Sequence, residues 1–474
     1  MSSEPLPQGF GLVLDAKVRR HCDGRVLASA TTGRVITLSR AGRDSLNDLL
    51  NATPDTQPPI ATPAMRGLAR GLVDAGIAHP RPPATRGPID ITIIVAVRDR
   101  ADLLEGLLAA LGQDHPVVVV DDGSADPDAV SAVCDRHRAQ LLRRSVNGGP
   151  AAARNSGLAT VETEFVAFID SDCVPGAGWI QRLMPHFADP LVAAVAPRIS
   201  ARRSSANKQS LRERYAQARS PLDMGSVEAE VGPGRPIAYV PTAALLVRLS
   251  ALVGGFDEGL RYGEDVDAIW RLSDAGWRVR YEPKVTVGHN EPASWRDLLG
   301  RRLRYGTSSA PLSDRHPGRL APVVLAPWPT VTALAAITGK RRLALTLSGL
   351  YALRLSHRLR ATGAGPSTAL LWSTRSTART AALLGRASTM LAGPALICAL
   401  GHGRLRRPAA ALLLLSPVSQ WLMTRPPVDL IRWTAASLVD DTAYGIGVWI
   451  GCVRKRTLAP LLPRRTSRDP YKSA

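Results

Sequence analysis

Two carboxylates one residue apart follow an apolar run near the middle of the chain. In "FVAFIDSDCVPGAGWI", Asp170 and Asp172 come directly after "FVAFI", and the pair Pro175–Gly176 follows. Carboxylates at i and i+2 of an irregular turn can both face one divalent cation, and Mg²⁺ or Mn²⁺ accepts their oxygens while keeping positions open for phosphate. An isolated pair is more often a helix cap or an Asx turn. Its place after a buried strand favours a site for a metal and a nucleotide diphosphate.

A second acidic pair, Glu264 and Asp265, begins the helix-like segment "EDVDAIWRL". Gly263 breaks the chain before it, and the apolar residues after it recur at helical spacing. A helix N-terminus favours ionised carboxylates, and such a carboxylate can remove the proton from an attacking hydroxyl. Capping of the helix by an acid is the alternative.

Two more loops contain residue types that bind ligands. In "VVVVDDGSAD", Asp121 and Asp122 end a β-branched run, where an acid can accept hydrogen bonds from the base or sugar of a nucleotide. In "NGGPAAARNSGL", the pair Gly148–Gly149 allows close approach of a ligand to the backbone. The helix that follows carries Arg154 near its start, which makes an anion site. A simple turn and a tight loop are the respective alternatives.

The elements that position these motifs follow from the pattern between residues 89 and 312. The runs "IDITIIVAV" and "PVVVV" are continuous and β-branched, and "RADLLEGLLAAL" between them has helical spacing. Strand–helix alternation predicts an α/β fold with a mostly parallel sheet covered on both faces. Ligands of such sheets bind beyond the carboxyl ends of the strands.

Residues 1–80 form a separate small unit in this interpretation. "GLVLDAKVRR" and "GRVITLSRAG" are strand-like, whereas "AGRDSLNDLL" and "PAMRGLARGLVDAGIA" have the spacing of amphipathic helices. The order is similar to that of a PqqD-like winged-helix module, a peptide chaperone. A plain packing domain and a DNA-binding winged helix are the alternatives. The proline-rich residues 81–88 are expected to be a linker.

Residues 313–474 are basic and contain several apolar stretches. Between Asp314 and Asp429 there are 15 Lys and Arg residues and no acidic residue, and the tail after residue 453 is basic too. The uncharged stretch Leu320–Gly339 alone reaches the roughly 20 residues that a spanning helix needs, and it carries three prolines. This composition favours helices that lie on an anionic cytoplasmic leaflet. Spanning helices and helices buried against the central domain are the alternatives.

The overall composition limits the partners. A formal net charge of +20 and a pI of about 10.7 favour an anionic partner. Five cysteines without CxxC spacing indicate reduced thiols. The first residues, "MSSEPLPQGF", show no secretory signal, so we expect a cytoplasmic protein, at the inner face of the membrane where it contacts lipid. A nucleic acid is not an expected partner, because acidic motifs repel a phosphate backbone.

The four motifs, in this order, resemble those of the family 2 glycosyltransferases with the GT-A fold. The resemblance implies inverting transfer from a UDP-sugar with Mn²⁺ or Mg²⁺, with Asp265 as the base beside Glu264. It implies a metal site formed by Asp170, Asp172 and His289, the histidine of "VTVGHN". It implies that the nucleotide sugar is bound by Ala96, Val97, Arg98, Asp122, Asn147, Gly149, Arg154, Asp170 and Ser171. The family often has proline where this chain has Ala96, which leaves the shape of the base pocket open.

The whole layout, from the front module to "VDDTAYGIGVWIG", resembles the glycosyltransferases of mycofactocin systems. This implies transfer of glucose from UDP-glucose, as β-linked units, to a peptide-derived redox cofactor or its precursor. The front module would hold a precursor peptide or a partner protein. On the acceptor side we expect Trp270, whose flat face suits sugar stacking, and Arg301, for which a solvated basic helix is the alternative. Rival functions are transfer to a membrane lipid or envelope polysaccharide, and a non-catalytic peptide-binding scaffold.

Overall fold

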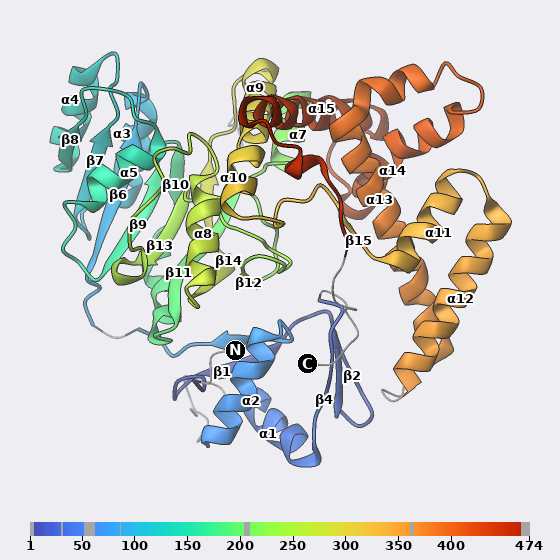
Figure 1. The fold of residues 1–474 in the computed structure, drawn as a ribbon. Coiled ribbons are helices and arrows are strands. Elements are labelled where there is room, and N and C mark those ends of the chain that lie inside the picture. Colours follow the sequence, from blue (N-terminus) through green and yellow to red (C-terminus); the bar gives the residue numbers. More distant parts are fainter. Residues whose placement is uncertain are drawn as a thin grey trace.

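The chain has three parts (Figure 1): a central α/β domain, a small N-terminal unit beneath it, and C-terminal helices beside it. This computed structural model describes residues 4–29, 32–51, 62–85, 87–202, 209–360 and 365–465. The last nine residues of the expected basic tail lie outside the described residues, as does residue 86 of the expected linker. All five cysteines are free.

The central domain is built on a nine-stranded sheet with the order β10-β14-β11-β13-β9-β6-β7-β8, in which β12 also pairs with β14. The strands are β6 (Ile91–Val97), β7 (Val117–Asp121), β8 (Gln140–Arg143), β9 (Phe165–Asp170), β10 (Cys173–Pro175), β11 (Val192–Ala201), β12 (Ala229–Val231), β13 (Ala244–Arg248) and β14 (Arg278–His289). β6 to β9 run parallel, as predicted. The sheet as a whole is mixed, because β10, β12 and β13 pair antiparallel in its other half.

Helices cover both faces of this sheet. They are α3 (Ala101–Leu111), α4 (Pro127–His137), α5 (Pro150–Leu158), α6 (Trp179–Leu183), α7 (Leu211–Ala218) and α8 (Glu264–Asp274), with 3₁₀ turns at Met184–Ala188 and Leu249–Ala251. One core contains Leu104, Val130 and Ile180 from α3, α4 and α6. The other contains Ala153 of α5 and Ile269 of α8. Because both faces are covered, the central strands are apolar along their length.

The N-terminal unit packs against the amino-terminal end of β14. Its elements are β1 (Gly11–Leu14), β2 (Val18–His21), β3 (Val26–Ser29), β4 (Val35–Thr37), α1 (Arg40–Asn51), α2 (Pro63–Asp74) and β5 (Ala78–Arg81), with β1 paired to β5 and β2-β3-β4 forming a second sheet. Arg70 donates two hydrogen bonds to Asp189, over 2.7 and 2.9 Å. Asp74 accepts two from Arg278, over 2.9 and 2.8 Å. Since Arg278 begins β14, the unit lies at the opposite end of that strand from His289.

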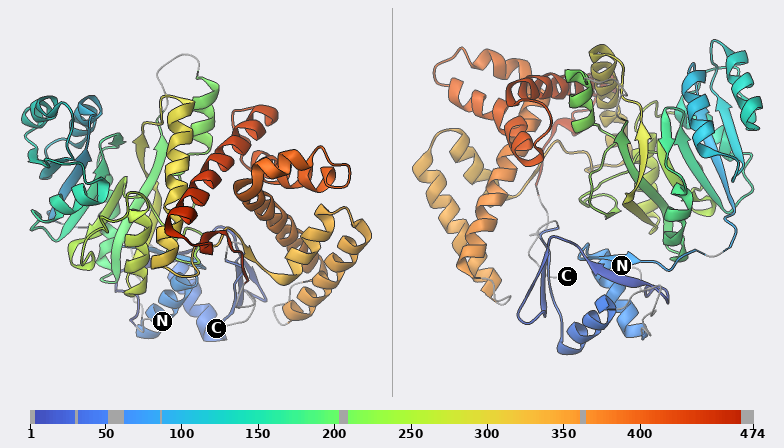
Figure 2. Two further views of the ribbon diagram at one scale, coloured as in Figure 1. Left: turned by 45° about the horizontal axis from the view of Figure 1, so that its top comes forward. Right: turned by 180° about the vertical axis from the view of Figure 1, so that it is seen from behind.

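The C-terminal region is helical. Its elements are α9 (Trp295–Thr307), α10 (Ser309–Arg315), α11 (Pro327–Ile337), α12 (Arg341–Leu359), α13 (Pro366–Ala399), α14 (Arg406–Thr424) and α15 (Leu430–Lys455), a 3₁₀ turn at Ala459–Leu461, and β15 (Val324–Leu325) paired with β16 (Arg464–Arg465). Figure 2 shows α15 crossing α9. Within the described residues, α13 is the one helix long and apolar enough to cross a membrane, and it is kinked at Ala392. The stretch Leu320–Gly339 does not form such a helix, because its prolines limit it to the 11 residues of α11.

Candidate active site

The carboxyl ends of three neighbouring parallel strands meet at one edge of the sheet. Ala96 of β6 lies opposite Asp170 of β9, and Val97 lies opposite Asp121 of β7. Val97 is buried and Ala96 is half-buried, whereas the side chain of Arg98 just beyond them is 53% exposed. The register therefore brings the loops after these strands together, as expected from the sequence.

The carboxylate of Asp122 holds the glycine loop in place. It accepts hydrogen bonds from the backbone N–H groups of Gly148 and Gly149, over 2.9 and 2.7 Å, and from Nε of Arg144 over 3.0 Å. Gly149 has a φ of +90°, which favours glycine, and directly precedes α5. Asn147 is half-buried in the same loop. Asp122 thus shapes the loop that presents the N-terminus of α5.

Arg154 of α5 joins the motif after β9 to the motif at the start of α8. Its Nη2 donates to Oδ1 of Asp170 and its Nη1 donates to Oε1 of Glu264, each over 2.8 Å. Burial would lower the pKa of Arg154, but the charges of Asp170 and Glu264 raise it above its usual value. Arg154 therefore remains a cation that holds two carboxylates from different motifs in one cluster.

Asp265 lies next to this cluster and is half-buried. One of its oxygens accepts a hydrogen bond from the backbone N–H of Val266 over 2.8 Å. Burial raises the pKa of Asp265 to about 7, and the neighbouring charge of Glu264 acts in the same direction. A carboxylate that titrates near neutrality can accept a proton from a hydroxyl and hold it. These electrostatics suit a general base.

His289 ends β14 and lies opposite Cys173 of β10, which brings it next to Asp172. Its Nε2 is 3.6 Å from Oδ2 of Asp172, and its Nδ1 is 3.4 Å from Oε1 of Glu291. Burial would lower the pKa of His289, but hydrogen bonding to Asp172 and Glu291 raises it to about 9. Burial would raise the pKa of Asp172, but His289 holds it below its usual value.

The three residues expected to hold a divalent cation are partly arranged for it. In the part of the chain that the structure describes, no group of three or more Asp, Glu, His or Cys side chains has the spacing of a metal site. Asp170 is turned toward Arg154. Asp172 and His289 do face each other, and among the described residues the buried Nδ1 of His289 has no hydrogen-bond partner except Glu291, at the edge of hydrogen-bonding distance. A metal-binding histidine whose second nitrogen faces a carboxylate is a common arrangement, so Asp172 and His289 fit such a site.

Two charged residues at the site were not predicted. Nη1 of Arg100 donates to Oδ2 of Asp172 over 2.7 Å. Glu291, beside His289, accepts from Nη2 of Arg301 over 2.7 Å. Glu291 lies two residues beyond His289, so alternation along an extended chain is the signal that could have found it. No such alternation marks Arg100, because Asp99 between Arg98 and Arg100 has a φ of +54°.

Trp270 is a core residue, and we therefore leave it out of the acceptor site. Its side chain is 4% exposed, its Nε1 donates to the backbone oxygen of Ala238 over 2.9 Å, and its ring packs edge-on against His316. Trp270 lies four residues after Val266, which is buried too, so it belongs to the buried stripe of α8. Ser171 is also buried, at 7% exposure.

Comparison with known proteins finds similarity along nearly the whole chain. Residues 92–249 match the family described as Glycosyl transferase family 2. The chain is 38% identical over 481 residues, 98% of its length and 99% of the relative's, to a protein of Mycobacterium tuberculosis (strain CDC 1551 / Oshkosh) named Pre-mycofactocin glycosyltransferase. This chain belongs to glycosyltransferase family 2, as a mycofactocin-system member. The central domain of the enzyme is accordingly a GT-A-like α/β fold.

The glycosyltransferase has more distant relatives as well. It is 30% identical over 272 residues, 48% of its chain and 86% of the relative's, to the N-acetylglucosaminyl-diphospho-decaprenol L-rhamnosyltransferase of the same organism. A solved structure of a mannosyltransferase from Pyrobaculum calidifontis in complex with GDP-Man and Mn²⁺ covers 78% of this chain and 90% of its own, at 18% identity and a TM-score of 0.43.

Proposed function

We propose that this glycosyltransferase moves glucose from UDP-glucose to pre-mycofactocin, with inversion at the anomeric carbon. The observation that carries the proposal is the Arg154 cluster, in which one buried cation holds Asp170 and Glu264 2.8 Å from its two nitrogens. Arg154 thereby brings the motif of Asp170, at the proposed donor site, next to the motif of Glu264 and Asp265, which contains the proposed base. The acceptor is taken from the name of the relative that is similar along the full chain.

The chain's own side chains supply the steps of this reaction. Asp265 accepts the proton of the acceptor hydroxyl. The hydroxyl oxygen forms a bond to the anomeric carbon while the bond from that carbon to the UDP oxygen breaks. Attack from the side opposite the leaving group turns an α-linked donor into a β-glycoside. Arg154, together with the half-exposed Arg98 and Arg100, binds the diphosphate.

We also propose a divalent cation, Mn²⁺ or Mg²⁺, held by Asp172 and His289 with Asp170 as the third ligand. Glu291 orients the ring of His289 through Nδ1. A divalent cation bound here would offset the charge that develops on the departing diphosphate. The N-terminus of α5, reached through Gly149, binds the remaining phosphate oxygens.

The test is release of UDP from UDP-glucose with Mn²⁺, with and without pre-mycofactocin. We expect metal-dependent turnover that falls about 10³-fold in Asp265→Asn, with binding of UDP and Mn²⁺ retained in calorimetry. Asp274→Asn, at the exposed end of the same helix, is the matched control and should leave turnover unchanged. The coupling constant of the anomeric proton in the product reports inversion. If the wild type neither turns over any nucleotide sugar nor binds one with metal, the non-catalytic scaffold becomes the better interpretation.

We propose further that the C-terminal helices rest on an anionic lipid surface at the cytoplasmic face of the membrane. Large apolar side chains are exposed on them, including Leu345, Leu353, Met423 and Ile431 at 74%, 68%, 75% and 81%. Residues 315–428, which include Leu345, Leu353 and Met423, contain 15 Lys and Arg residues and no acid. An apolar and basic surface of this kind suits the boundary between headgroups and acyl chains.

Vesicle flotation tests the lipid surface. We expect the enzyme to float with phosphatidylglycerol vesicles and to do so less with phosphatidylcholine vesicles. The double variant Leu345→Ser/Leu353→Ser should float less, whereas Val253→Ser, which changes an 81% exposed residue of the central domain, should not differ from wild type. Absence of flotation with both lipids would contradict this part of the proposal.

For the N-terminal unit we propose a PqqD-like winged-helix module that holds the precursor peptide or a partner protein. Support comes from its attachment: the pair Arg70–Asp189 is 5% exposed on both sides, so a bound peptide would stay fixed to the enzyme. Calorimetric titration with the precursor peptide checks this. We expect the peptide to bind to wild type and to Asp265→Asn alike. If it binds to neither, the precursor peptide is not a ligand of the N-terminal unit.

A further inference from the structure

Helix α9 presents two faces to two different parts of the enzyme. Arg301 and Tyr305 are four residues apart and share one face, whereas Arg302 and Gly306 share the next. Nη2 of Arg301 donates to Oε2 of Glu291 over 2.7 Å. The first face therefore lies toward the candidate metal residues, and the second lies toward α15.

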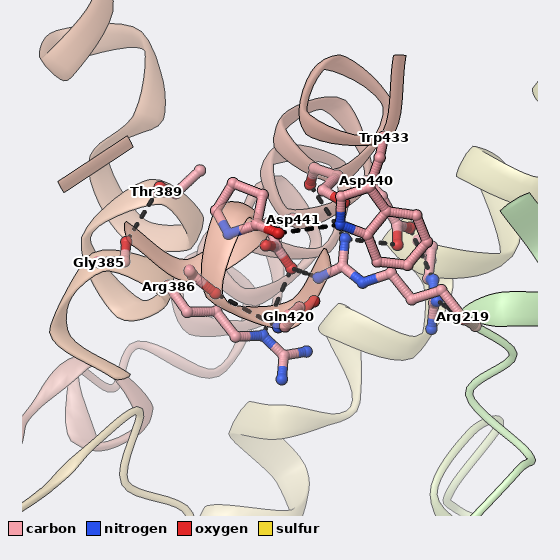
Figure 3. A network of polar contacts seen from close by, with 12 residues as sticks. Arg219, Gly385, Arg386, Thr389, Gln420, Trp433, Asp440 and Asp441 are labelled. Atoms are coloured by element: carbon pink, nitrogen blue, oxygen red, sulfur yellow. Dashed lines mark hydrogen bonds and ion pairs between the residues drawn. The ribbon is translucent and has the colours of Figure 1, made fainter. Parts of the chain in front are cut away.

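Arg302 fastens the second face to α15. Its Nε donates to Oδ1 of Asp440 over 2.7 Å, and its Nη2 donates to the backbone oxygen of Arg219 over 2.7 Å. Arg219 in turn donates to Oδ1 of Asp441 over 2.8 Å, and Figure 3 shows its guanidinium beside both aspartates. Because the side chains of Arg302 and Asp440 are only 15% and 3% exposed, this pairing is shielded from water.

Glycines bring α15 very close to α9 where the two helices cross. A Cβ atom on Gly306 would lie 2.1 Å from the backbone oxygen of Tyr444. A Cβ atom on Gly447 would lie 2.0 Å from the backbone oxygen of Leu303. No side chain fits at either position, so the contact with α15 determines the position of α9 along its axis and its rotation about that axis (Figure 2).

The first face of α9 places Tyr305 beside the start of α8. Its ring centroid lies 6.3 Å from that of Tyr262, with the rings edge-on at 63°. Tyr262 comes two residues before Glu264. Gly263 between them touches the junction of α9 and α10, because a Cβ atom there would lie 3.2 Å from Cβ of Ser308. The tyrosine pair and the acidic motif therefore occupy one small region.

Both tyrosine rings are half-buried. Among the residues described, neither the Tyr262 nor the Tyr305 hydroxyl has a hydrogen-bond partner. Burial raises the pKa of Tyr305 to about 12; Arg301 opposes the rise, and the charges of Asp265 and Asp170 add to it. The hydroxyl therefore keeps its proton at neutral pH and lies within the field of both carboxylates. A ring with a free hydroxyl offers an apolar face and a hydrogen-bond donor together.

We propose that the acceptor substrate is bound by Arg301 and Tyr305 of α9 together with Tyr262, which precedes α8. We call these three residues the α9 wall. The ligand class is a ring that carries hydroxyl groups. The two tyrosine rings contact its apolar face, while their hydroxyls and Arg301 bind its hydroxyl groups and direct one of them to Asp265. This inference rests on the proposed function, and it makes α15 a support of the acceptor site.

Steady-state kinetics with UDP-glucose, Mn²⁺ and pre-mycofactocin test the α9 wall. We expect Tyr305→Leu and Tyr262→Leu each to raise the acceptor KM about tenfold. The donor KM and the release of UDP without acceptor should stay within about twofold of wild type, which a general folding defect would not allow. Tyr305→Phe, which keeps the ring, should raise the acceptor KM less. Tyr351→Leu, the same substitution in α12, is the matched control.

Two results would overturn the α9 wall: unchanged acceptor KM in both leucine variants, or equal rises of donor and acceptor KM. Failure of the wild type to use pre-mycofactocin would instead contradict the proposed acceptor. In that case calorimetry with phenyl β-D-glucopyranoside, in the presence of UDP and Mn²⁺, tests the wall. Binding to wild type and Tyr351→Leu but not to Tyr305→Leu would support it. No binding to wild type, or equal binding to all three, would overturn it.

Discussion

Arg154 and Asp170 form an ion pair in which Nη2 of the arginine donates to Oδ1 of the carboxylate over 2.8 Å. The second arm of the same guanidinium donates to Glu264, 110 residues later in the chain. The side chain of Arg154 is only 5% exposed, so water does little to screen these contacts. Arg154 alone therefore supplies the positive charge that offsets both Asp170 and Glu264 in these contacts.

Replacing that residue should damage binding and stability together. Arg154→Met leaves Asp170 and Glu264 without their shared cation. We expect loss of detectable UDP-glucose binding and a fall of about 3 kcal/mol in the free energy of unfolding, measured by calorimetry and urea titration. Arg154→Lys keeps the charge but cannot donate to both carboxylates with one rigid fork, so it should be intermediate. Stability equal to wild type in Arg154→Met would contradict this account.

The pH dependence of the reaction should report Asp265. A general base must be deprotonated, and the pKa of Asp265 is raised to about 7. We therefore expect kcat/KM to fall about tenfold per pH unit below pH 7 and to level off above it. Asp265→Asn should have no such limb. A wild-type profile that stays flat down to pH 5 would show that another group is the base.

The same raised pKa should make Asp265 costly for stability at neutral pH. Below about pH 4 the carboxyl is protonated in both the folded and the unfolded chain, so it contributes no difference. As the pH rises toward 7 the unfolded chain releases the proton while the folded chain retains it, which favours unfolding. Asp265→Asn should therefore be more stable than wild type at pH 8, by roughly 1 to 4 kcal/mol.

Urea unfolding at pH 5 and pH 8 checks this expectation. The gain in Asp265→Asn should be larger at pH 8 than at pH 5. Asp314→Asn, at an exposed aspartate of α10, should give no pH-dependent gain. An equal gain at both pH values would point to a packing effect of the amide instead.

Removal of the metal should stop turnover. We expect EDTA to abolish UDP release and Mn²⁺ to restore it. His289→Ala and Glu291→Gln should each raise the Mn²⁺ concentration needed for half-maximal turnover by about 10- to 100-fold. Titration of bound Mn²⁺ by electron paramagnetic resonance should show the same loss of affinity in each variant. His186→Gln, at a buried histidine beside Glu282, is the control. Full activity in EDTA would contradict the proposed metal site.

The contact between α15 and α9 predicts an effect of a residue far along the chain. Asp440→Asn leaves Arg302 without its ionised partner, so one of the contacts that hold α9 against α15 is weakened. We expect a rise of about three- to tenfold in the acceptor KM at unchanged donor KM. Asp429→Asn, at the exposed start of α15, should change neither value. Parallel loss of donor and acceptor binding would indicate only a destabilised fold.

Local patterns along the chain were enough for much of the site. Because a β-branched run that ends abruptly is a buried strand, Asp170 and Asp121 could be placed at strand ends, and the structure confirms that these two ends flank the end of β6. The helix start at Glu264 followed from Gly263 in the same way. Such features need only the residues next to them in the sequence.

Trp270 was expected on the acceptor side because its flat ring suits a sugar, but the structure buries it at 4% exposure. A sequence does not show whether an apolar side chain of a helix faces a core or a ligand. The basic segment around Arg301 raised the same difficulty. A solvated helix was the alternative for it, but Arg301 pairs with Glu291 and Arg302 pairs with Asp440.

The sequence by itself determined the strand ends, the acidic motifs and the family they resemble. Tertiary structure alone decided which charges meet. Arg154 reaches Glu264 only because α5 and α8 pack on the same face of the sheet. His289 reaches Asp172 only through the pairing of β14 with β10, and α9 is held by aspartates on α15. Each of these contacts joins residues more than 100 positions apart, and over such separations only packing and strand register, which are properties of the whole fold, determine the partner.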